Sequence, residues 1–170
     1  TAVVQDERGV DENRKKSHQV LRGKKDAVRK GYWPGGPAPF GFQFQTDARA
    51  ERSDEYGAKT LLIPDEPKAF VIRQLFQRAA DTNHGAGRLA RYLNDNSHIA
   101  ESLKPFFSST IDSWLQNPLF IGKYVFNRIC LDVVDDSRIR QKNDEEDHIV
   151  VEDFCEPLVP KTQFDEVQAL

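Results

Sequence analysis

The sequence predicts an α+β domain in which a long N-terminal basic helix and a helix-turn-helix-like pair of helices pack with short antiparallel strands. Apolar residues recur at helical spacing in several separate segments of the chain. Short apolar runs bounded by turn residues indicate strands between those segments. This mixed order of helices and short strands is typical of the α+β class, and 170 residues are enough to bury one core.

The first expected helix spans residues 10–30 and is strongly basic. Between Arg14 and Lys30 it has eight basic residues and one acid, a net charge of +7. Lys15, Arg22 and Arg29 recur at intervals of seven residues and therefore share one face. A solvated amphipathic helix and a phosphate-binding helix would both show this pattern. Four apolar residues fall toward the other side: Val20, Leu21, Ala27 and Val28.

Residues 31–42 form the most informative segment, a loop that combines glycine and proline with aromatic side chains. Four glycines and three prolines in twelve residues predict a rigid, shaped loop rather than a flexible linker. Behind a basic helix, this loop predicts that something flat or anionic comes close. Nucleic acid is favoured because lysine and arginine neutralise phosphates. Trp33 either contacts that partner or covers the core.

Two strands and a helix are expected next. Three phenylalanines alternate with glycine and glutamine over residues 40–45, which is the period of a half-buried strand. Residues 46–59 are polar and predict a hairpin loop or an insertion, and residues 60–63 predict a second strand. Asp65 then caps a helix that has Pro67 in its first turn. The core is expected to centre on this helix, which ends at residues 83–85 and has the apolar face Phe70, Ile72, Leu75, Phe76 and Ala79.

A pair of helices separated by residues 97–107 has the order of a helix-turn-helix with a lengthened turn. The first helix covers residues 86–96. The second begins at Ser108, which is predicted to cap it, and stops at Asn117 because Pro118 disfavours helix before it. His84 and His98 are expected at helix ends or in loops. The predicted packing residues are Leu89, Ala90 and Leu93 in the first helix, and Ile111, Trp114 and Leu115 in the second.

The other side of the second helix is a polar stripe formed by Ser109, Asp112, Ser113 and Gln116. These residues share one face, and their side chains can reach base edges in a major groove. Any surface helix has a polar outer face, so the stripe gains its meaning from the basic helix and the loop before it.

The last third of the chain predicts a hairpin and a final helix. One strand is expected over residues 122–134 and a second over residues 148–154. The acidic run of residues 144–147 between them predicts an exposed loop or hairpin tip held away from phosphates; a regulatory mimic of nucleic acid is the alternative. Residues 161–170 have the pattern of a helix start.

The charge of the chain is unevenly distributed. The formal net charge is −3 and the pI about 5.8, which is unusual for a free-standing DNA-binding domain. Residues 132–156 have ten acids against three bases, a net charge of −7. A basic front and an acidic back indicate that only one surface meets a polyanion.

Several function classes find no support in the composition. The chain has no apolar run near 18 residues and no signal-peptide pattern, so a soluble, cytoplasmic protein without membrane contact is expected. Cys130 and Cys155 have no CxxC partner and no histidine at metal spacing, so we expect reduced structural thiols, no metal and no cofactor. The chain starts at Thr1 and has no methionine, which predicts an excerpt from a longer polypeptide.

The ordered motifs resemble the recombinase domain of large serine recombinases, the phage-integrase and transposon-resolvase type of site-specific recombinase. The resemblance covers residues 11–170, and its specificity lies in the ordered set. Many relatives have tyrosines where this chain has Phe40 and Phe42, which removes a hydroxyl contact while keeping the rings. The matching pieces are Gly31 with Trp33-Pro34-Gly35-Gly36, Pro39-Phe40-Gly41-Phe42, residues 63–76, Leu89-Ala90-Arg91-Tyr92-Leu93-Asn94, residues 111–122 with Trp114-Leu115-Gln116-Asn117-Pro118, and Glu156-Pro157-Leu158-Val159 followed by Phe164 and Val167.

The resemblance implies a division of labour. In such enzymes a separate N-terminal domain supplies the serine nucleophile that forms a phosphoserine link to DNA, and nothing here matches that domain. No catalytic residue is therefore assigned, and the fragment is expected to bind DNA without catalysing a reaction. Residues 1–31 would be the linker helix passing over the minor groove, residues 32–160 the DNA-binding domain, and residues 161–170 the start of a C-terminal helix. A zinc-ribbon domain often follows in the family.

The expected partner is double-stranded DNA, as half of an attachment site, and self-association is expected in the full-length recombinase. The parent would act in the cytoplasm of a bacterium or of a phage host. The predicted DNA-binding residues are Arg14, Lys15, Lys16, Arg22, Lys25, Arg29, Lys30, Trp33, Gly35, Gly36, Ser109, Asp112, Ser113 and Gln116.

Two other classes remain open at the level of sequence. A winged-helix transcriptional regulator would use the same helix pair with a hairpin wing. A protein-interaction module would use the aromatic loop as a hot spot and the basic helix for an acidic partner. A hydrolase built on either cysteine with a histidine has no supporting spacing.

Overall fold

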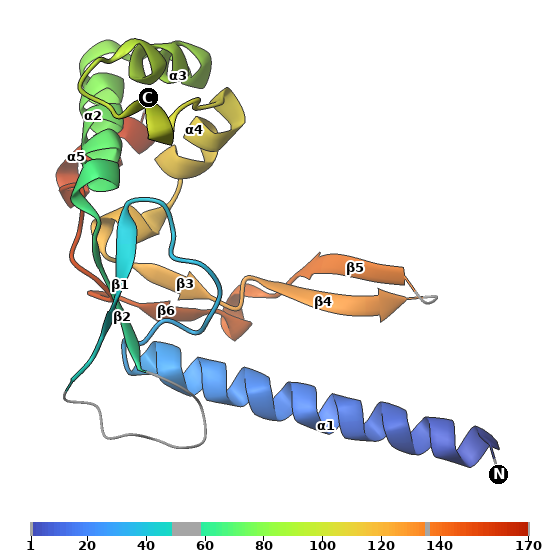
Figure 1. Cartoon of the computed structure of the whole chain (residues 1–170). Helices are drawn as coiled ribbons and strands as arrows, with labels where there is room; N and C mark the ends of the chain where they lie inside the picture. Colours follow the sequence, from blue (N-terminus) through green and yellow to red (C-terminus); the bar gives the residue numbers. More distant parts are fainter. Residues whose placement is uncertain (1, 49–58, 135–136, 170) are drawn as a thin grey trace.

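The computed structural model describes residues 2–48, 59–134 and 137–169. Three two-stranded antiparallel sheets and five α-helices make up the described part, which confirms the α+β class. Helices α2 to α5 gather at one end of the molecule, and the strand pairs lie between them and α1 (Figure 1). The molecule therefore has a helical end and a strand-rich middle from which α1 projects.

Helix α1 (Ala2–Arg29) has 28 residues and begins eight residues before the expected start at residue 10. It continues through Gly9, which the sequence pattern had left outside the helix. The end is close to the predicted one because Gly31 has a φ of 83°, the left-handed conformation that closes a helix. The Tyr32 N–H donates to the Ala27 carbonyl and the Gly31 N–H to the Val28 carbonyl, both at 2.9 Å, which forms a Schellman motif.

Strands β1 (Phe42–Thr46) and β2 (Thr60–Pro64) pair antiparallel, with Phe42 opposite Pro64 and Thr46 opposite Thr60. The prediction of a strand from residue 40 was wrong by two residues, because Phe40 lies in a turn that the Phe42 N–H closes onto the Pro39 carbonyl at 3.1 Å. Of the predicted insertion at residues 46–59, residues 49–58 lie outside the described part of the chain.

Helices α2 (Glu66–Thr82) and α3 (Ala86–Asp95) are confirmed close to their expected bounds. Asp65 is at the N-cap of α2 but makes no side-chain cap; its carboxylate instead accepts from Lys68 Nζ at 2.7 Å. The helix ends at Asn83, which adopts the left-handed conformation with φ 48°.

The second helix of the pair is α4 (Ser108–Leu115), reached through the 3-10 turn Glu101–Leu103. The prediction that Ser108 caps α4 was wrong: Ser108 is already its first helical residue, and Phe107 occupies the N-cap. A second 3-10 turn, Pro118–Ile121, follows, and α5 (Lys161–Gln168) confirms the expected final helix.

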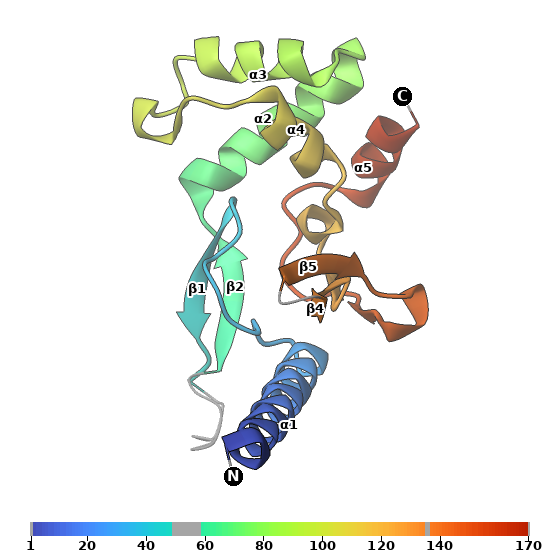
Figure 2. The same cartoon turned by 90° about the vertical axis from the view of Figure 1, so that its right-hand side faces the viewer.

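The predicted hairpin between residues 122–134 and 148–154 is only partly correct. Strand β3 (Tyr124–Phe126) pairs with β6 (Ile149–Val151), as expected. Between them lies a second hairpin of β4 (Ile129–Val134) and β5 (Ser137–Lys142), which splits the predicted first strand in two. In Figure 2, α1 points toward the viewer beneath β4 and β5. The acidic run forms the exposed 3-10 turn Glu145–Asp147 between β5 and β6, so it is a loop and not a hairpin tip.

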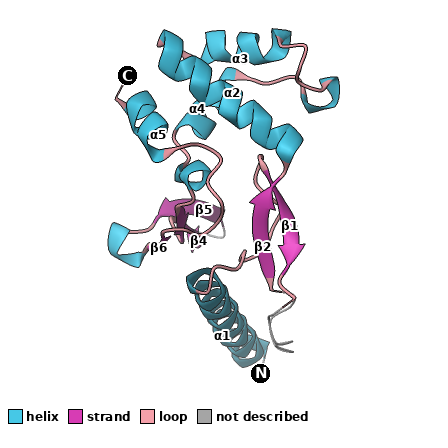
Figure 3. Cartoon of the chain, turned by 90° about the vertical axis from the view of Figure 1, so that its left-hand side faces the viewer, coloured by secondary structure: helices cyan, strands magenta, loops and turns pink. Residues whose placement is uncertain are grey.

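The hydrophobic core centres on α2, as predicted. Val71, Ile72, Leu75 and Phe76 are fully buried, and the Phe76 ring contacts the rings of two residues distant in sequence, Phe120 and Phe164. Helix α2 runs diagonally through the helical end (Figure 3). The other buried residues of this core come from most elements of the fold: Val28, Phe42, Leu62, Ala69, Ala79, Leu89, Ala90, Leu93, Ile99, Phe106, Ile111, Leu119, Phe154, Leu158 and Val159.

Candidate nucleic-acid interface

The cationic side chains of α1 are displayed on the surface. Among its described side chains, Lys25 is half-buried and the other predicted cations, Lys15, Lys16, Arg22 and Arg29, are exposed; Lys30, directly after the helix, is exposed as well. Arg14 lies within α1, but its side chain is outside the described set. Arg29 Nη1 pairs with Asp26 Oδ1 at 3.3 Å, an exposed contact of the kind that contributes little stability and leaves the cation accessible.

The apolar side of α1 is less uniform than the sequence pattern predicted. Val28 is fully buried and Leu21 is half-buried, but Val20 is 53% exposed. Val20 and Leu21 line a shallow groove of about 470 Å³ together with Lys16, Ser17 and Lys24. Among the described side chains of α1, full burial occurs at Val28 near its C-terminus, and the helix contacts β6.

Trp33 fixes one end of the glycine loop to the body of the domain. Its backbone N–H donates to the Thr60 carbonyl at 2.8 Å, and its indole N–H donates to the Gly36 carbonyl at 3.3 Å. The indole ring lies 5.2 Å from the Tyr124 ring and 6.5 Å from the Phe154 ring. Trp33 thus covers the core through these contacts and remains half-buried.

Phe40 fixes the other end of the loop to α4. Its ring stacks on Trp114 of α4 with a centroid distance of 4.4 Å and meets Phe106 edge-on at 6.1 Å. The aromatic side chains of the loop suggest contact with a flat molecule. In the structure, Trp33 and Phe40 instead pack largely on aromatic rings of the chain itself. Between the two anchors, Gly35 and Gly36 are exposed and have positive φ values of 115° and 86°.

The polar stripe of α4 is solvent-accessible along its length. Ser109, Asp112, Ser113 and Gln116 are all exposed, while Ile111 on the opposite side is fully buried. No ion pair or side-chain hydrogen bond involves these four residues within the described residues of the chain. The stripe is therefore free to make contacts with a partner.

A side-chain clamp from α3 positions the start of α4. The Asn94 amide donates to the Phe106 carbonyl at 3.0 Å, and its carbonyl oxygen accepts from the Phe106 N–H at 2.8 Å. Both backbone groups of one buried residue are satisfied by a single amide, so the chain entering α4 is held in one geometry. The other end of α4 is fixed by Gln168 of α5, which donates to the Leu115 carbonyl at 2.7 Å.

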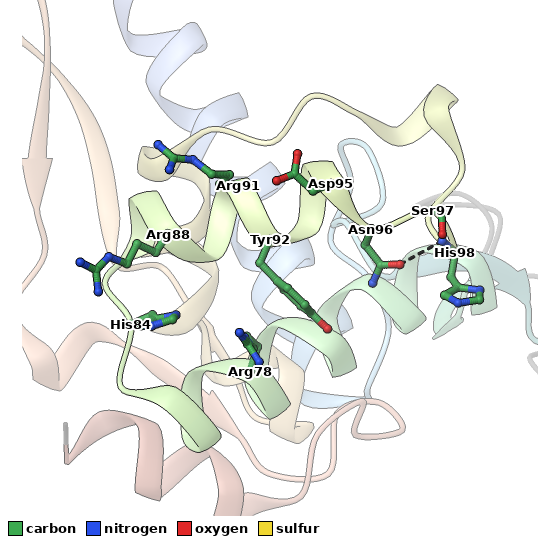
Figure 4. Close-up of a pocket in the computed structure, with 9 residues that line it drawn as sticks. All are labelled: Arg78, His84, Arg88, Arg91, Tyr92, Asp95, Asn96, Ser97 and His98. Atoms are coloured by element: carbon green, nitrogen blue, oxygen red, sulfur yellow. Dashed lines mark hydrogen bonds between the residues drawn. The ribbon is translucent and has the colours of Figure 1, made fainter.

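A basic groove was missed by the sequence reasoning. It is a cavity of about 630 Å³ formed by the end of α2, by α3 and by the residues after α3 (Figure 4). The Arg78 guanidinium lies over the Tyr92 ring at 4.9 Å, and Tyr92 donates to Gln74 at 3.1 Å. His84 and His98 lie in loops next to the ends of α3, as predicted, and both line the groove. The cationic and histidine residues that line the groove are Arg78, His84, Arg88, Arg91 and His98.

The groove gathers arginines that are scattered in the sequence, so no run of charge points to it. Arg78 comes from α2, while Arg88 and Arg91 come from α3. Neither α1 nor α4 contributes a lining residue, which separates this groove from the predicted contact residues.

Two half-buried groups, the Cys155 thiol and the Tyr124 hydroxyl, have raised pKa values and therefore hold their protons more firmly than usual. Burial raises the pKa of the Cys155 thiol to about 12, with a smaller effect of Glu156, so the thiol is neutral at physiological pH. Burial likewise raises the pKa of Tyr124 to about 12. Within the described residues, no three histidine, cysteine, aspartate or glutamate side chains are grouped to hold a metal ion. None of the described helices is long and apolar enough to cross a membrane.

Comparison with known proteins points to one family. The family model described as Recombinase matches residues 66–170. Among solved structures, the chain is similar to the one described as "Crystal Structure of a LSR-DNA Complex", with a TM-score of 0.55 and 16% sequence identity. The similarity covers 89% of this chain and 38% of that chain. At this sequence identity, the structural similarity shows a shared fold and nothing more. A search of curated proteins found no match to the chain.

Proposed function

Because the chain belongs to the Recombinase family, we propose that it is a sequence-specific DNA-binding domain of a serine site-specific recombinase and binds half of an attachment site. The cations of α1 would contact phosphates, and the polar stripe of α4 would contact base edges in the major groove. Strand exchange through a phosphoserine intermediate, for integration or excision, would belong to the complete recombinase, and we assign no catalytic serine among these 170 residues.

The observation that carries the proposal is the rigid connection between α1 and α4. Helix α1 ends in a Schellman motif at Gly31. The Trp33 N–H then donates a hydrogen bond to the Thr60 carbonyl of β2, and the Phe40 ring stacks on Trp114 of α4. In Figure 2, α1 and α4 both lie toward the viewer, so the two elements face the same side of the molecule. A duplex along that side would meet the cations of one helix and the polar stripe of the other.

The exposed glycines of the loop fit the same arrangement. Gly35 and Gly36 are exposed, and a Cβ added to either would meet no atom within 4 Å, which leaves room for a close approach of the DNA backbone. The exposed part of Trp33 would contact the DNA backbone.

We further propose that the recombinase acts on DNA in the cytoplasm and associates with itself there.

Selection from a duplex library randomised over two helical turns tests the proposal. The whole chain is incubated with the library, bound duplexes are recovered and amplified, and the enriched sequences are compared. Enrichment of one consensus is the expected result, because the stripe presents hydrogen-bonding groups that distinguish bases. Recovery of unchanged random sequences, or no recovery of duplex, would contradict the proposal and favour a protein-interaction module.

A further inference from the structure

Phe107 is an exposed aromatic residue at the start of α4. Its exposed fraction of 64% exceeds that of the other exposed large apolar residues in the described part of the chain, among them Val20 at 53% and Phe44 at 45%. It is not part of the core cluster, and no aromatic contact of its ring occurs within the described residues. Its neighbour Phe106 is buried and makes the aromatic contacts to Phe40 and Trp114.

The position that Phe107 occupies makes a phenylalanine costly. It is the N-cap of α4, where serine, threonine, aspartate and asparagine are preferred because their side chains accept a hydrogen bond from the first turn. No side-chain cap is present at α4. The chain therefore gives up a cap and also exposes an aromatic ring. Such local violations concentrate at functional sites.

The backbone around Phe107 is held firmly in spite of this exposure. The Phe107 carbonyl accepts from the Thr110 N–H at 3.0 Å and from the Ile111 N–H at 3.1 Å. The residue before it is clamped by Asn94. The ring therefore projects from a fixed point at the N-terminal end of α4, and its exposure does not result from a loose segment.

We propose that Phe107 recognises the C5-methyl group of a thymine in the major groove. This inference rests on the proposed function, since it requires α4 to lie in that groove. The first residues of a recognition helix contact base edges, and Phe107 stands at that end of α4. The thymine methyl is the apolar group on the base edges of the major groove, and phenylalanine is among the residues that contact it. The polar stripe itself offers no apolar side chain for this contact.

Replacing thymine by deoxyuridine removes that methyl group and leaves the hydrogen-bonding edge unchanged. In the duplex selected from the library, each thymine is replaced in turn, and the affinity of the whole chain is measured for each duplex. We expect one replacement to weaken binding by the wild-type chain about threefold to tenfold. Phe107→Ala and Phe107→Ser should bind the thymine duplex more weakly and should bind both duplexes equally.

Two variants provide the controls. Phe107→Ser places a preferred capping residue at the N-cap, so loss of methyl discrimination in this variant cannot arise from a weakened helix. Phe44→Ala removes a different exposed phenylalanine, 45% exposed on β1, and should keep the full effect of the thymine replacement.

The outcomes separate this inference from the proposed function. If the wild-type chain prefers the selected duplex but every thymine replacement affects it and the Phe107 variants equally, the role of Phe107 is wrong and the proposed function stands. If the wild-type chain binds selected and scrambled duplexes equally, both are wrong. A position at which deoxyuridine weakens the wild-type chain alone supports both.

Discussion

At the scale of single residues, Gly41 joins the loop to the core. It has a φ of +97°, and a Cβ placed on it would lie 2.7 Å from Cδ1 of Leu158. The turn chemistry at this position could be predicted from the sequence. The approach of Leu158 could not, because it joins segments more than a hundred residues apart.

Replacing Gly41 with alanine should lower the free energy of unfolding by about 3 kcal/mol, since it adds both backbone strain and an overlap in the core. Gly31→Ala is the matched control, because Gly31 has a φ of +83° with open space around it and should lose only about 1 kcal/mol. Urea unfolding of the two variants measures both values. Equal losses would mean that Leu158 yields without cost.

The half-buried Tyr124 and Cys155 predict a loss of stability in alkaline solution. Their ordinary pKa values are 10.0 and 9.0, and burial raises the pKa of each to about 12 in the folded protein. As pH rises above about 9, the unfolded chain releases protons that the folded chain retains, so stability falls with pH. Below that range both groups are neutral in both states and contribute no slope.

Tyr124→Phe isolates the tyrosine part of this effect. The ring contacts with Trp33 and Phe154 can persist in this variant, while the ionisable hydroxyl is lost. Urea unfolding from pH 8 to pH 11 should show a shallower loss for Tyr124→Phe than for the wild-type chain above pH 10. Parallel curves for the two proteins would show that the hydroxyl does not contribute.

At the scale of elements, α1 and α4 are expected to have different tasks. Arg22 or Arg29 to alanine should weaken binding to every duplex and make the salt dependence shallower by about one unit, because one phosphate contact is lost. Ser113 or Gln116 to alanine should instead change which duplex is preferred, with a cost of about 1–3 kcal/mol at one base pair. Binding to the selected and scrambled duplexes at several salt concentrations measures both properties. If the two classes of variant behave alike, the placement of α4 is wrong.

The sequence predicted an element well where apolar residues recur at helical spacing and the same residues are buried in the structure. The apolar face of α2 and the packing side of α4 are examples, since Ile72 and Ile111 are both fully buried. Strand β5 was missed because its residues Ser137–Lys142 are mostly polar or basic and pair with β4 in a hairpin of their own. Strand β5 is recognised by its hydrogen-bonded pairing with β4, because its sequence lacks the alternating apolar residues of a half-buried strand.

The candidate site was predicted in part for a related reason. The stripe of α4 and the cations of α1 are local patterns, and the stripe and the described cations other than Lys25 are exposed. The clamp of Asn94 on Phe106 and the groove that joins Arg78 to Arg88 depend on contacts between elements. An asparagine or arginine in a helix gives no sequence signal of such a contact.

At the scale of the whole molecule, the loop of residues 31–42 acts as a fixed spacer. Its aromatic residues pack inward at both ends, on Tyr124 and on Trp114, so the loop sets the position of α1 relative to α4. The exposed acidic turn Glu145–Asp147 belongs to the connection between β5 and β6, away from both helices in sequence. The net charge of −3 therefore averages over a basic N-terminal helix and an acidic segment near the C-terminal end.

One salt series decides whether this domain binds a specific DNA sequence through α1 and α4. Affinity of the whole chain for the selected duplex and for a scrambled duplex is measured at increasing salt concentration. If about five phosphates are engaged, log affinity should fall with log salt at a slope of roughly −4 to −5, and the selected duplex should stay preferred throughout. A flat salt response, or equal binding of the two duplexes, would contradict specific DNA binding by α1 and α4.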